Sequence, residues 1–341
     1  MSKQRLMDFS LTNDQKELQS AFGQFFDEHA TITDLRAAEP LGFSAALWQA
    51  AGKLGIPDMA AGAMTDGAPA SLSQLIVIAE EYGRRLAPIP LVESLSAARA
   101  LDRAGAVPPA HGIVTLAVRP VPESGAAPLL AAGAIADAAV GLVGRDFVLA
   151  GLVDDGHSGW VSNLGASPLA NRNLAQQRTV LASGDAAQEA YERALDDWKL
   201  LLAAALIGVT AEAHRMALAY VKERKAFGVP IGWFQTVAHR LADSITDLDG
   251  ARFLVHKAAW AVDERSDTGT RMVSMAYVYV TELAERVTSE SLHFHGGIGY
   301  TLEHDIQLYF RRAKCWPLAL GDPRHELTVL SARLLGPRRG G

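Results

Sequence analysis

The sequence contains few of the residues that form cross-links, metal sites or membrane spans. Cys315 is the only cysteine among 341 residues, which excludes an internal disulfide framework and any zinc or iron–sulfur site built on several cysteines. The N-terminal stretch lacks the apolar segment of a signal peptide. The other apolar stretches are alanine-rich and interrupted, so we expect a cytoplasmic protein without membrane insertion.

Basic charge is also scarce. The formal net charge is -6, from 32 lysines and arginines against 38 acids, which argues against nucleic acid as a partner. Apolar side chains are abundant instead and make up 49% of the chain. Over this length they are enough to bury the core of one large domain or two smaller ones.

Helical periodicity dominates both ends of the chain. Thr12 and Gln15 have the spacing of a capping box, and an amphipathic pattern follows them. Helical patterns return after the middle of the chain, at about residues 186–222, 234–263, 272–293, 305–314 and 324–335.

The middle of the chain predicts strands. Short apolar runs at 112–118 and 147–150 lie between glycines, prolines and aspartates, whereas residues 122–133 indicate a loop. The predicted fold is therefore α+β and mostly α. It has an N-terminal helical domain (1–106), a small β domain (107–185) and a C-terminal helical bundle (186–341).

Two glycine-containing segments interrupt the C-terminal helices. The first is RKAFGVPIGWFQ, residues 224–235; by itself it is consistent with a helix connection whose cations complement the helix dipole. The second is HFHGGIGY, residues 293–300. It is consistent with a glycine C-cap, or with a backbone left open for a phosphate or a flat ring. His293 and His295 lack a nearby carboxylate cluster, so we expect no metal site.

Taken together and in this order, these segments resemble the acyl-CoA dehydrogenase family. The resemblance rests on Arg-x-x-Phe-Gly-x-Pro-Ile from Arg224, on the HGGxGY stretch and on Arg-x-Ala-Lys at 311–314. Leu-Gly-Ile-Pro at 54–57 and Glu-Glu-Tyr-Gly at 80–83 fit as well. The resemblance covers essentially the whole chain and implies that family's three-part fold, with FAD near a subunit interface and an acyl-CoA thioester as substrate.

The resemblance also implies roles for the residues of the first segment. Arg224 would neutralise the FAD pyrophosphate. Phe227 would pack on the cofactor, Ile231 would line the site and Gln235 would hydrogen-bond nearby.

The second segment has implied roles too. His293 stands where the family usually has glutamine, and the backbone at Gly296 and Gly297 would approach the dinucleotide. Family architecture places this segment on the partner subunit.

The sequence departs from the family at the catalytic base. The family's reaction needs a carboxylate that removes the α-proton of the thioester. Leu320 and Trp198 occupy the two positions where members carry that glutamate. In the family, a Thr-Glu-Pro stretch and a tryptophan-containing strand cover the flavin ring. Neither is found between residues 115 and 183, where residues 123–126 resemble the first only weakly.

Other acids are weak candidates for the base. Asp322 lies two positions beyond Leu320, although its position before Pro323 is typical of a helix N-cap. We expect Asp196 and Asp197 to be solvated. Glu282 and Glu285 are expected to be surface charges.

Three functions remain open from the sequence. The chain resembles the shorter subunit of steroid side-chain dehydrogenases, which pairs with a complete subunit in an α2β2 assembly, helps to hold FAD and lacks the base. It also fits a homomeric dehydrogenase, a homodimer or tetramer, with an unusual base. A third possibility is a structural or binding homologue without catalysis.

Overall fold

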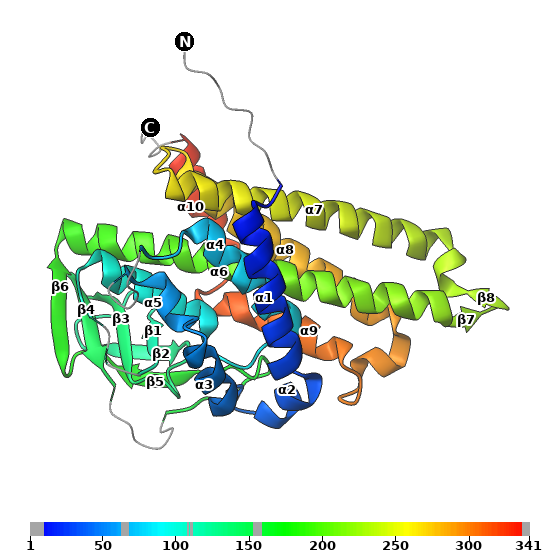
Figure 1. Cartoon of the computed structure of the whole chain (residues 1–341), viewed down its shortest axis with the longest axis horizontal. Coiled ribbons are helices and arrows are strands. Elements are labelled where there is room, and N and C mark those ends of the chain that lie inside the picture. The colour runs from blue at the N-terminus through cyan, green and yellow to red at the C-terminus, as the bar shows by residue number, and fades with distance from the viewer. Residues whose placement is uncertain (1–9, 63–67, 108, 110–111, 153–158, 336–341) are drawn as a thin grey trace, which may run out of the picture.

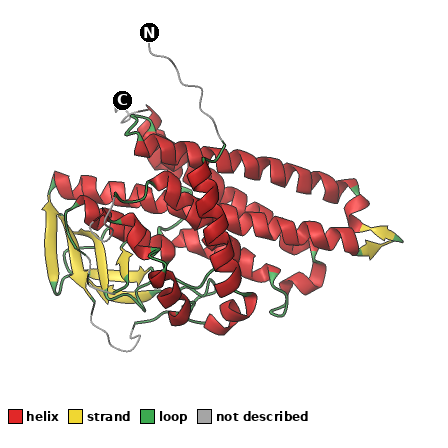
Figure 2. Cartoon of the chain, viewed as in Figure 1, coloured by secondary structure: helices red, strands yellow, loops and turns green. Residues whose placement is uncertain are grey.

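Helices form most of the protein, and the larger sheet lies at one end of it (Figures 1 and 2). The computed structural model describes residues 10–62, 68–107, 109, 112–152 and 159–335. The N-terminal elements are α1 (Asn13–His29), α2 (Ile32–Ala38), α3 (Ala45–Lys53), η1 (Pro57–Ala60), α4 (Leu72–Arg85) and α5 (Leu91–Arg103). The middle strands are β1 (Val114–Leu116), β2 (Ala126–Leu130), β3 (Ala138–Val143), β4 (Asp146–Gly151), β5 (Ala170–Asn173) and β6 (Arg178–Ser183). The C-terminal elements are α6 (Asp185–Glu223), β7 (Lys225–Ala226), β8 (Val229–Pro230), η3 (Ile231–Trp233), α7 (Gln235–Asp263), α8 (Gly269–Phe294), η4 (Gly296–Tyr300), α9 (Ile306–Cys315), η5 (Trp316–Ala319) and α10 (His325–Leu335).

The capping box predicted at the start of α1 is confirmed. The Thr12 hydroxyl accepts a hydrogen bond from the Gln15 backbone N–H at 3.2 Å, and the Gln15 side chain accepts one from the Thr12 N–H at 2.9 Å. Two N–H groups that have no partner within the helix are thereby satisfied.

The larger sheet is organised around β3, all six residues of which are buried. The strand order is β1-β3-β4-β6; β1 runs parallel to β3, and the other neighbours are antiparallel. A strand buried on both faces needs a covering layer, and α5 and α6 both contact β3.

A second pair of strands corrects one expectation. The loop predicted at 122–133 contains β2, which pairs with β5 in an antiparallel register that shifts between Ala127 and Leu130. The partner strand is about 40 residues away in the chain, and local periodicity cannot reveal such a pairing.

Helix α6 is the central element of the bundle and packs against α4, α7, α8 and α9. Its length and composition would allow it to cross a membrane, contrary to the sequence expectation. However, 83% of the apolar 18-residue stretch that meets this criterion is buried inside the protein. That burial is typical of a core helix.

Glycine allows α4 and α6 to approach closely. A Cβ atom added to Gly83 would lie 1.8 Å from the carbonyl oxygen of Ala205, and one added to Gly208 would lie 1.9 Å from that of Glu80. Neither position has room for a side chain. Gly83 belongs to the 80–83 segment that carried the family resemblance, so its role there is helix packing.

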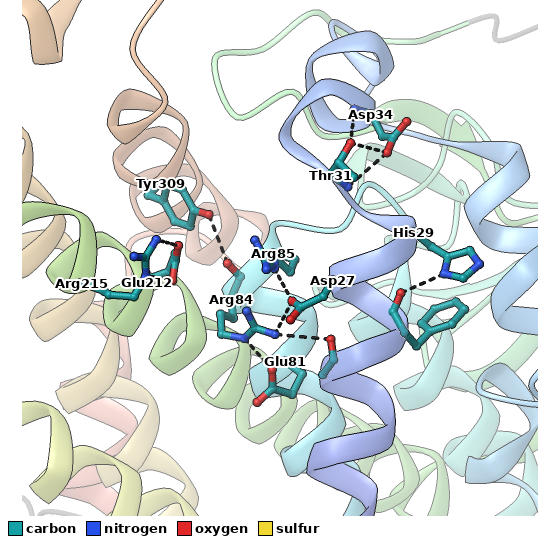
Figure 3. A network of polar contacts seen from close by, with 12 residues as sticks. Asp27, His29, Thr31, Asp34, Glu81, Arg84, Arg85, Glu212, Arg215 and Tyr309 are labelled. Atoms are coloured by element: carbon teal, nitrogen blue, oxygen red, sulfur yellow. Dashed lines mark hydrogen bonds and ion pairs between the residues drawn. The ribbon is translucent and has the colours of Figure 1, made fainter. Parts of the chain in front are cut away.

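Polar contacts connect α1, α4 and α9 at the side of the bundle (Figure 3). Arg84 donates to Asp27 and to Glu81, each at 2.6 Å, and the Tyr309 hydroxyl donates to the Arg84 carbonyl at 3.2 Å. Because these groups are partly exposed, each pair adds little stability. Their combined effect is to orient α1 and α9 against α4.

Two aspartates of α6 lie in the interior, so the expectation that they are solvated is wrong. Asp197 is 1% exposed and pairs with Arg99 and Arg103 of α5, at 3.0 and 2.7 Å. Asp196 is 7% exposed and pairs with Arg333 of α10 at 3.2 Å. They are buried because α6 is continuous through this region, with α5 and α10 covering it.

Candidate functional site

The β7–β8 hairpin projects from the end of the bundle opposite the larger sheet (Figure 1). Its two turn residues, Phe227 and Gly228, have φ angles of 54° and 84°, as a two-residue type I′ turn requires. Glycine suits this left-handed region, but a bulky residue is strained there. Phe227 is nevertheless 97% exposed, and its ring makes an edge contact with Phe234, at 6.3 Å between ring centroids.

Arg224 caps the C-terminus of α6, and its carbonyl accepts a hydrogen bond from the Ile231 N–H at 2.8 Å. Its guanidinium is exposed and has no hydrogen-bond or ion-pair partner among the described residues. Ile231 is half-buried, and Gln235 is exposed in the first turn of α7. A backbone hydrogen bond therefore holds this segment in place, whereas the side chains of Arg224 and Gln235 are exposed and can bind a ligand.

The second segment follows the end of α8. Gly296 has a φ of 62°, and a Cβ atom added to Gly296 or Gly297 would meet nothing within 4 Å. His293 is exposed, but His295 is buried and its Nδ1 lies 2.7 Å from the Ser291 carbonyl. Backbone at the two glycines is thus open to a ligand.

The two segments meet within one chain. Tyr220 of α6 packs on the His295 ring at 4.4 Å. Phe294 belongs to the same small apolar cluster as Val221 and Ile231. The fold places the two segments close together in one chain; that a partner subunit supplies the second segment to a cofactor site stays a prediction.

A cavity of about 610 Å³ lies beside the hairpin, between α6 and α7. Its walls are apolar, but His214, Arg215 and Lys222 also line it. This is within the usual size of a small-ligand site. Arg215 is paired with Glu212 at 2.6 Å, so Lys222 is the lining cation that would favour an anionic ligand.

A second cavity, which we call the central cavity, has a volume of about 260 Å³ and lies where α5, the β layer and η5 meet. Its apolar lining includes Tyr82, Leu202 and Trp316. Of its described lining residues, Glu93 is the only acid.

Burial raises the pKa of the Glu93 carboxyl, and its own backbone N–H and the Trp198 indole partly offset this effect. The indole N–H of Trp198 lies near this carboxyl, but no partner in the described structure satisfies it with hydrogen-bond geometry. Glu93 is therefore a partly buried acid whose carboxyl pKa lies above its usual value.

The two positions where the base was sought are apolar and packed. Trp198 is 0% exposed, with its ring centroid 6.2 Å from that of Tyr277. Leu320 is half-buried against the main core. Neither side chain can accept a proton.

Asp322 has the opposite properties to those of a base. It is half-buried and pairs with Arg324, whose hydrogen bonds lower the pKa of Asp322 to about 2. It also accepts a hydrogen bond from the Arg324 backbone N–H at 3.0 Å, in the turn just before α10. Glu282 and Glu285 are exposed, as predicted.

Sequence reasoning missed two residues of the central cavity, Glu93 and Arg312. Glu93 lies in the first turn of α5, where an acid is ordinary. Arg312 occupies the variable position of Arg-x-Ala-Lys. Neither pattern signals a cavity, because the cavity walls come from three distant parts of the chain.

Comparison with known proteins decides the family. The model of the acyl-CoA dehydrogenase N-terminal domain matches residues 12–106, and that of the C-terminal domain matches residues 189–335. Acyl-CoA dehydrogenase IpdE2 of Mycolicibacterium smegmatis is 30% identical over 337 residues, which span 95% of this chain and 100% of that protein. The chain belongs to the acyl-CoA dehydrogenase family. The resemblance inferred from the sequence is confirmed.

Solved structures agree with this assignment. A variant of the Tcur3481–Tcur3483 steroid ACAD has a TM-score of 0.82 at 26% identity, covering 94% of this chain and 98% of that one. The ChsE4–ChsE5 complex from Mycobacterium tuberculosis has a TM-score of 0.84 at 24% identity, covering 97% and 100%. The predicted fold class is confirmed.

The cofactor of this acyl-CoA dehydrogenase family member is FAD, as predicted. The residues at the hairpin end fit such a group. An unpaired guanidinium, an exposed ring and open glycine backbone suit a pyrophosphate and a flat adenine. The role of each individual residue stays a prediction.

Proposed function

We propose that this chain is the accessory subunit of a heteromeric FAD-dependent acyl-CoA dehydrogenase, lacking the glutamate base of complete subunits. The observation that carries the proposal is the pair of apolar side chains, Trp198 and Leu320, at the positions of the base. An α-proton is not removed at a useful rate without a positioned base. The complete partner subunit would supply it.

In this proposal the hairpin end of the chain holds the cofactor. Arg224 would donate charge-assisted hydrogen bonds to the pyrophosphate, and the N–H groups around Gly297 would approach it. Phe227 would cover the adenosine half. When bound, FAD accepts the hydride from the β-carbon of the acyl group.

The same end supports a protein partner. Large apolar side chains are exposed in the two segments: Phe227 97% and Trp233 74% in the first, Ile298 51% and Tyr300 67% in the second, and Leu302 71% just after it. Exposed apolar side chains of this size are typical of an interface. We propose a full-length acyl-CoA dehydrogenase subunit as the partner, in an α2β2 assembly. The two-component names of Tcur3481–Tcur3483 and ChsE4–ChsE5 favour this choice, and the first favours a steroid-derived acyl group.

The test is co-expression with a full-length family member that carries the glutamate. We expect a complex with the mass of two copies of each chain, bound flavin, and acyl-CoA oxidation that the isolated chain lacks. The isolated chain should be slower by about 100- to 10,000-fold, the usual effect of losing a positioned base. Ordinary turnover by the isolated chain would exclude the accessory role.

One observation favours a second candidate, a homomeric enzyme with an unusual base. Glu93 lies in the central cavity with a raised pKa, close to Trp198. A desolvated acid of this kind resembles a catalytic base. If Glu93 is the base, the isolated chain is active, and Glu93→Gln lowers turnover by about 100-fold or more. Asp322→Asn is the matched control and should leave turnover unchanged.

A further inference from the structure

The central cavity contains a cation that the protein leaves partly unsatisfied. Arg312 lines this cavity and is 2% exposed. Its Nη2 lies 2.7 Å from Glu39 Oε1. Its Nη1 is buried and has no hydrogen-bond partner among the described residues. A buried guanidinium N–H without a partner is destabilising unless a ligand or water accepts its hydrogen bond.

The charges around Arg312 do not balance. Glu39 Oε1 also pairs with Arg311 Nη2 at 2.7 Å, so one carboxylate faces two guanidiniums. Burial lowers the pKa of Arg312, and Glu39 opposes that effect. Burial raises the pKa of the Glu93 carboxyl, which is the only acid among the described lining residues. Arg119 also lines the cavity and donates to the Pro128 carbonyl at 3.3 Å, so the excess charge is positive.

We propose that the central cavity binds a small apolar carboxylate, with one carboxylate oxygen accepting a hydrogen bond from Arg312 Nη1. The anion neutralises the excess positive charge, and the apolar walls around Tyr82, Leu202 and Trp316 enclose the rest of the molecule. A volume of about 260 Å³ suits a compact body such as a single ring. Binding of a free carboxylate needs neither FAD nor a thioester, so it can be measured apart from turnover; if Glu93 is the base, the carboxylate occupies the cavity of that reaction.

The probe is cyclohexanecarboxylate, titrated into the full-length chain and followed by calorimetry. Cyclohexanemethanol has a similar apolar body without the charge, and acetate has the charge without the ring. We expect the ring acid to bind about 10- to 100-fold more tightly than the alcohol, the usual effect of one charge-assisted hydrogen bond. Acetate should bind more weakly than the ring acid.

Two variants locate the site. Arg312→Gln keeps a polar group beside Glu39 but removes the charge, so affinity for the acid should fall to that for the alcohol. Leu202→Phe fills the cavity and keeps both arginines, so it should abolish binding of both probes. Lys314→Gln is the matched control: it removes one positive charge from the same helix but is not among the cavity's lining residues, and it should bind like the unmodified chain.

Three results would overturn the proposal. One is equal affinity of the unmodified chain for the acid and the alcohol. Another is unchanged acid binding by either cavity variant, with its thermal midpoint showing that it is folded. The third is no acid binding at millimolar concentration, which would mean that water alone satisfies Arg312. If Arg312→Gln does not fold, Leu202→Phe and the comparison of probes still decide the question.

Discussion

Phe227 combines strain and exposure in a single residue. A left-handed φ at a bulky residue costs on the order of 1–3 kcal/mol, and such strain persists where a site requires it. Asn-Gly would form the same turn without that strain. We therefore expect the aromatic ring at the tip of the hairpin to contact a group outside the chain.

We predict that Phe227→Asn stabilises the flavin-free chain by about 1 kcal/mol while weakening flavin retention. Asparagine tolerates the left-handed conformation but has no ring to cover the cofactor. Thermal midpoints of the flavin-free chain and flavin per chain after gel filtration measure the two effects. Phe227→Tyr keeps the ring and should keep the flavin; full flavin retention by Phe227→Asn would contradict the assigned contact.

Substitutions at Arg224 distinguish a side chain that binds the cofactor from one that only stabilises the end of a helix. Arg224→Ala should release flavin and leave the fold intact, because truncating one partner of a buried charge pair costs about 2–5 kcal/mol of binding. That is roughly 30- to several-thousand-fold in the dissociation constant. Arg224→Lys should be intermediate, since lysine keeps the charge and loses the planar fork.

The neighbouring cation supplies the control for Arg224. Lys225 is also exposed, and Lys225→Ala should keep its flavin. If Arg224 serves only the helix dipole, Arg224→Ala instead changes stability by about 0.3–1 kcal/mol and leaves flavin content unchanged.

At the scale of elements, the contact of α4 with α6 depends on glycine. Gly208→Ala should destabilise the chain by about 1–3 kcal/mol or more, because the added Cβ overlaps the Glu80 carbonyl and forces the helices apart. Gly250→Ala in α7 is the matched control, since nothing lies within 4 Å of its added Cβ. That change should stabilise the chain by about 0.5–1 kcal/mol through helix propensity.

Denaturant midpoints measure both glycine variants under the same conditions. We expect Gly208→Ala to lower the denaturant midpoint and Gly250→Ala to raise it, although both replace glycine by alanine. Equal effects at the two positions would show that α4 and α6 do not approach as closely as the structure indicates.

At the scale of the whole molecule, Asp196 makes folding stability depend on pH. Burial raises its pKa from 3.8 to about 6, against the attraction of Arg333 and Lys199. The folded state therefore holds this proton more tightly than the unfolded state. Its stabilising contribution is complete below about pH 4 and is lost as the pH rises through about 6.

We predict that Asp196→Asn removes this pH dependence. The free energy of unfolding of the unmodified chain, minus that of the variant, should fall by up to about 3 kcal/mol between pH 4 and pH 7, as expected for a shift of roughly two units. Urea unfolding at several pH values measures the difference. Parallel stability curves for the two proteins would contradict the assignment to Asp196.

The sequence by itself determined the class of fold and located the two glycine-containing segments that interrupt the C-terminal helices. The capping residues of α1, the helical periodicity and the glycines at 228 and 296 are local signals, because they reflect backbone geometry within a few residues. The family motifs added the cofactor. The absence of a glutamate at positions 198 and 320 is also evident from the sequence alone.

Only the tertiary structure decided which residues face cavities and which charges are buried. Asp196 and Asp197 have the composition of a solvated helix start, yet α5 and α10 cover them. Glu93 and Arg312 are more than 200 residues apart and line one cavity. Burial and pairing of this kind depend on contacts between distant segments, which local sequence patterns do not encode; the structure therefore determines the charge of the central cavity.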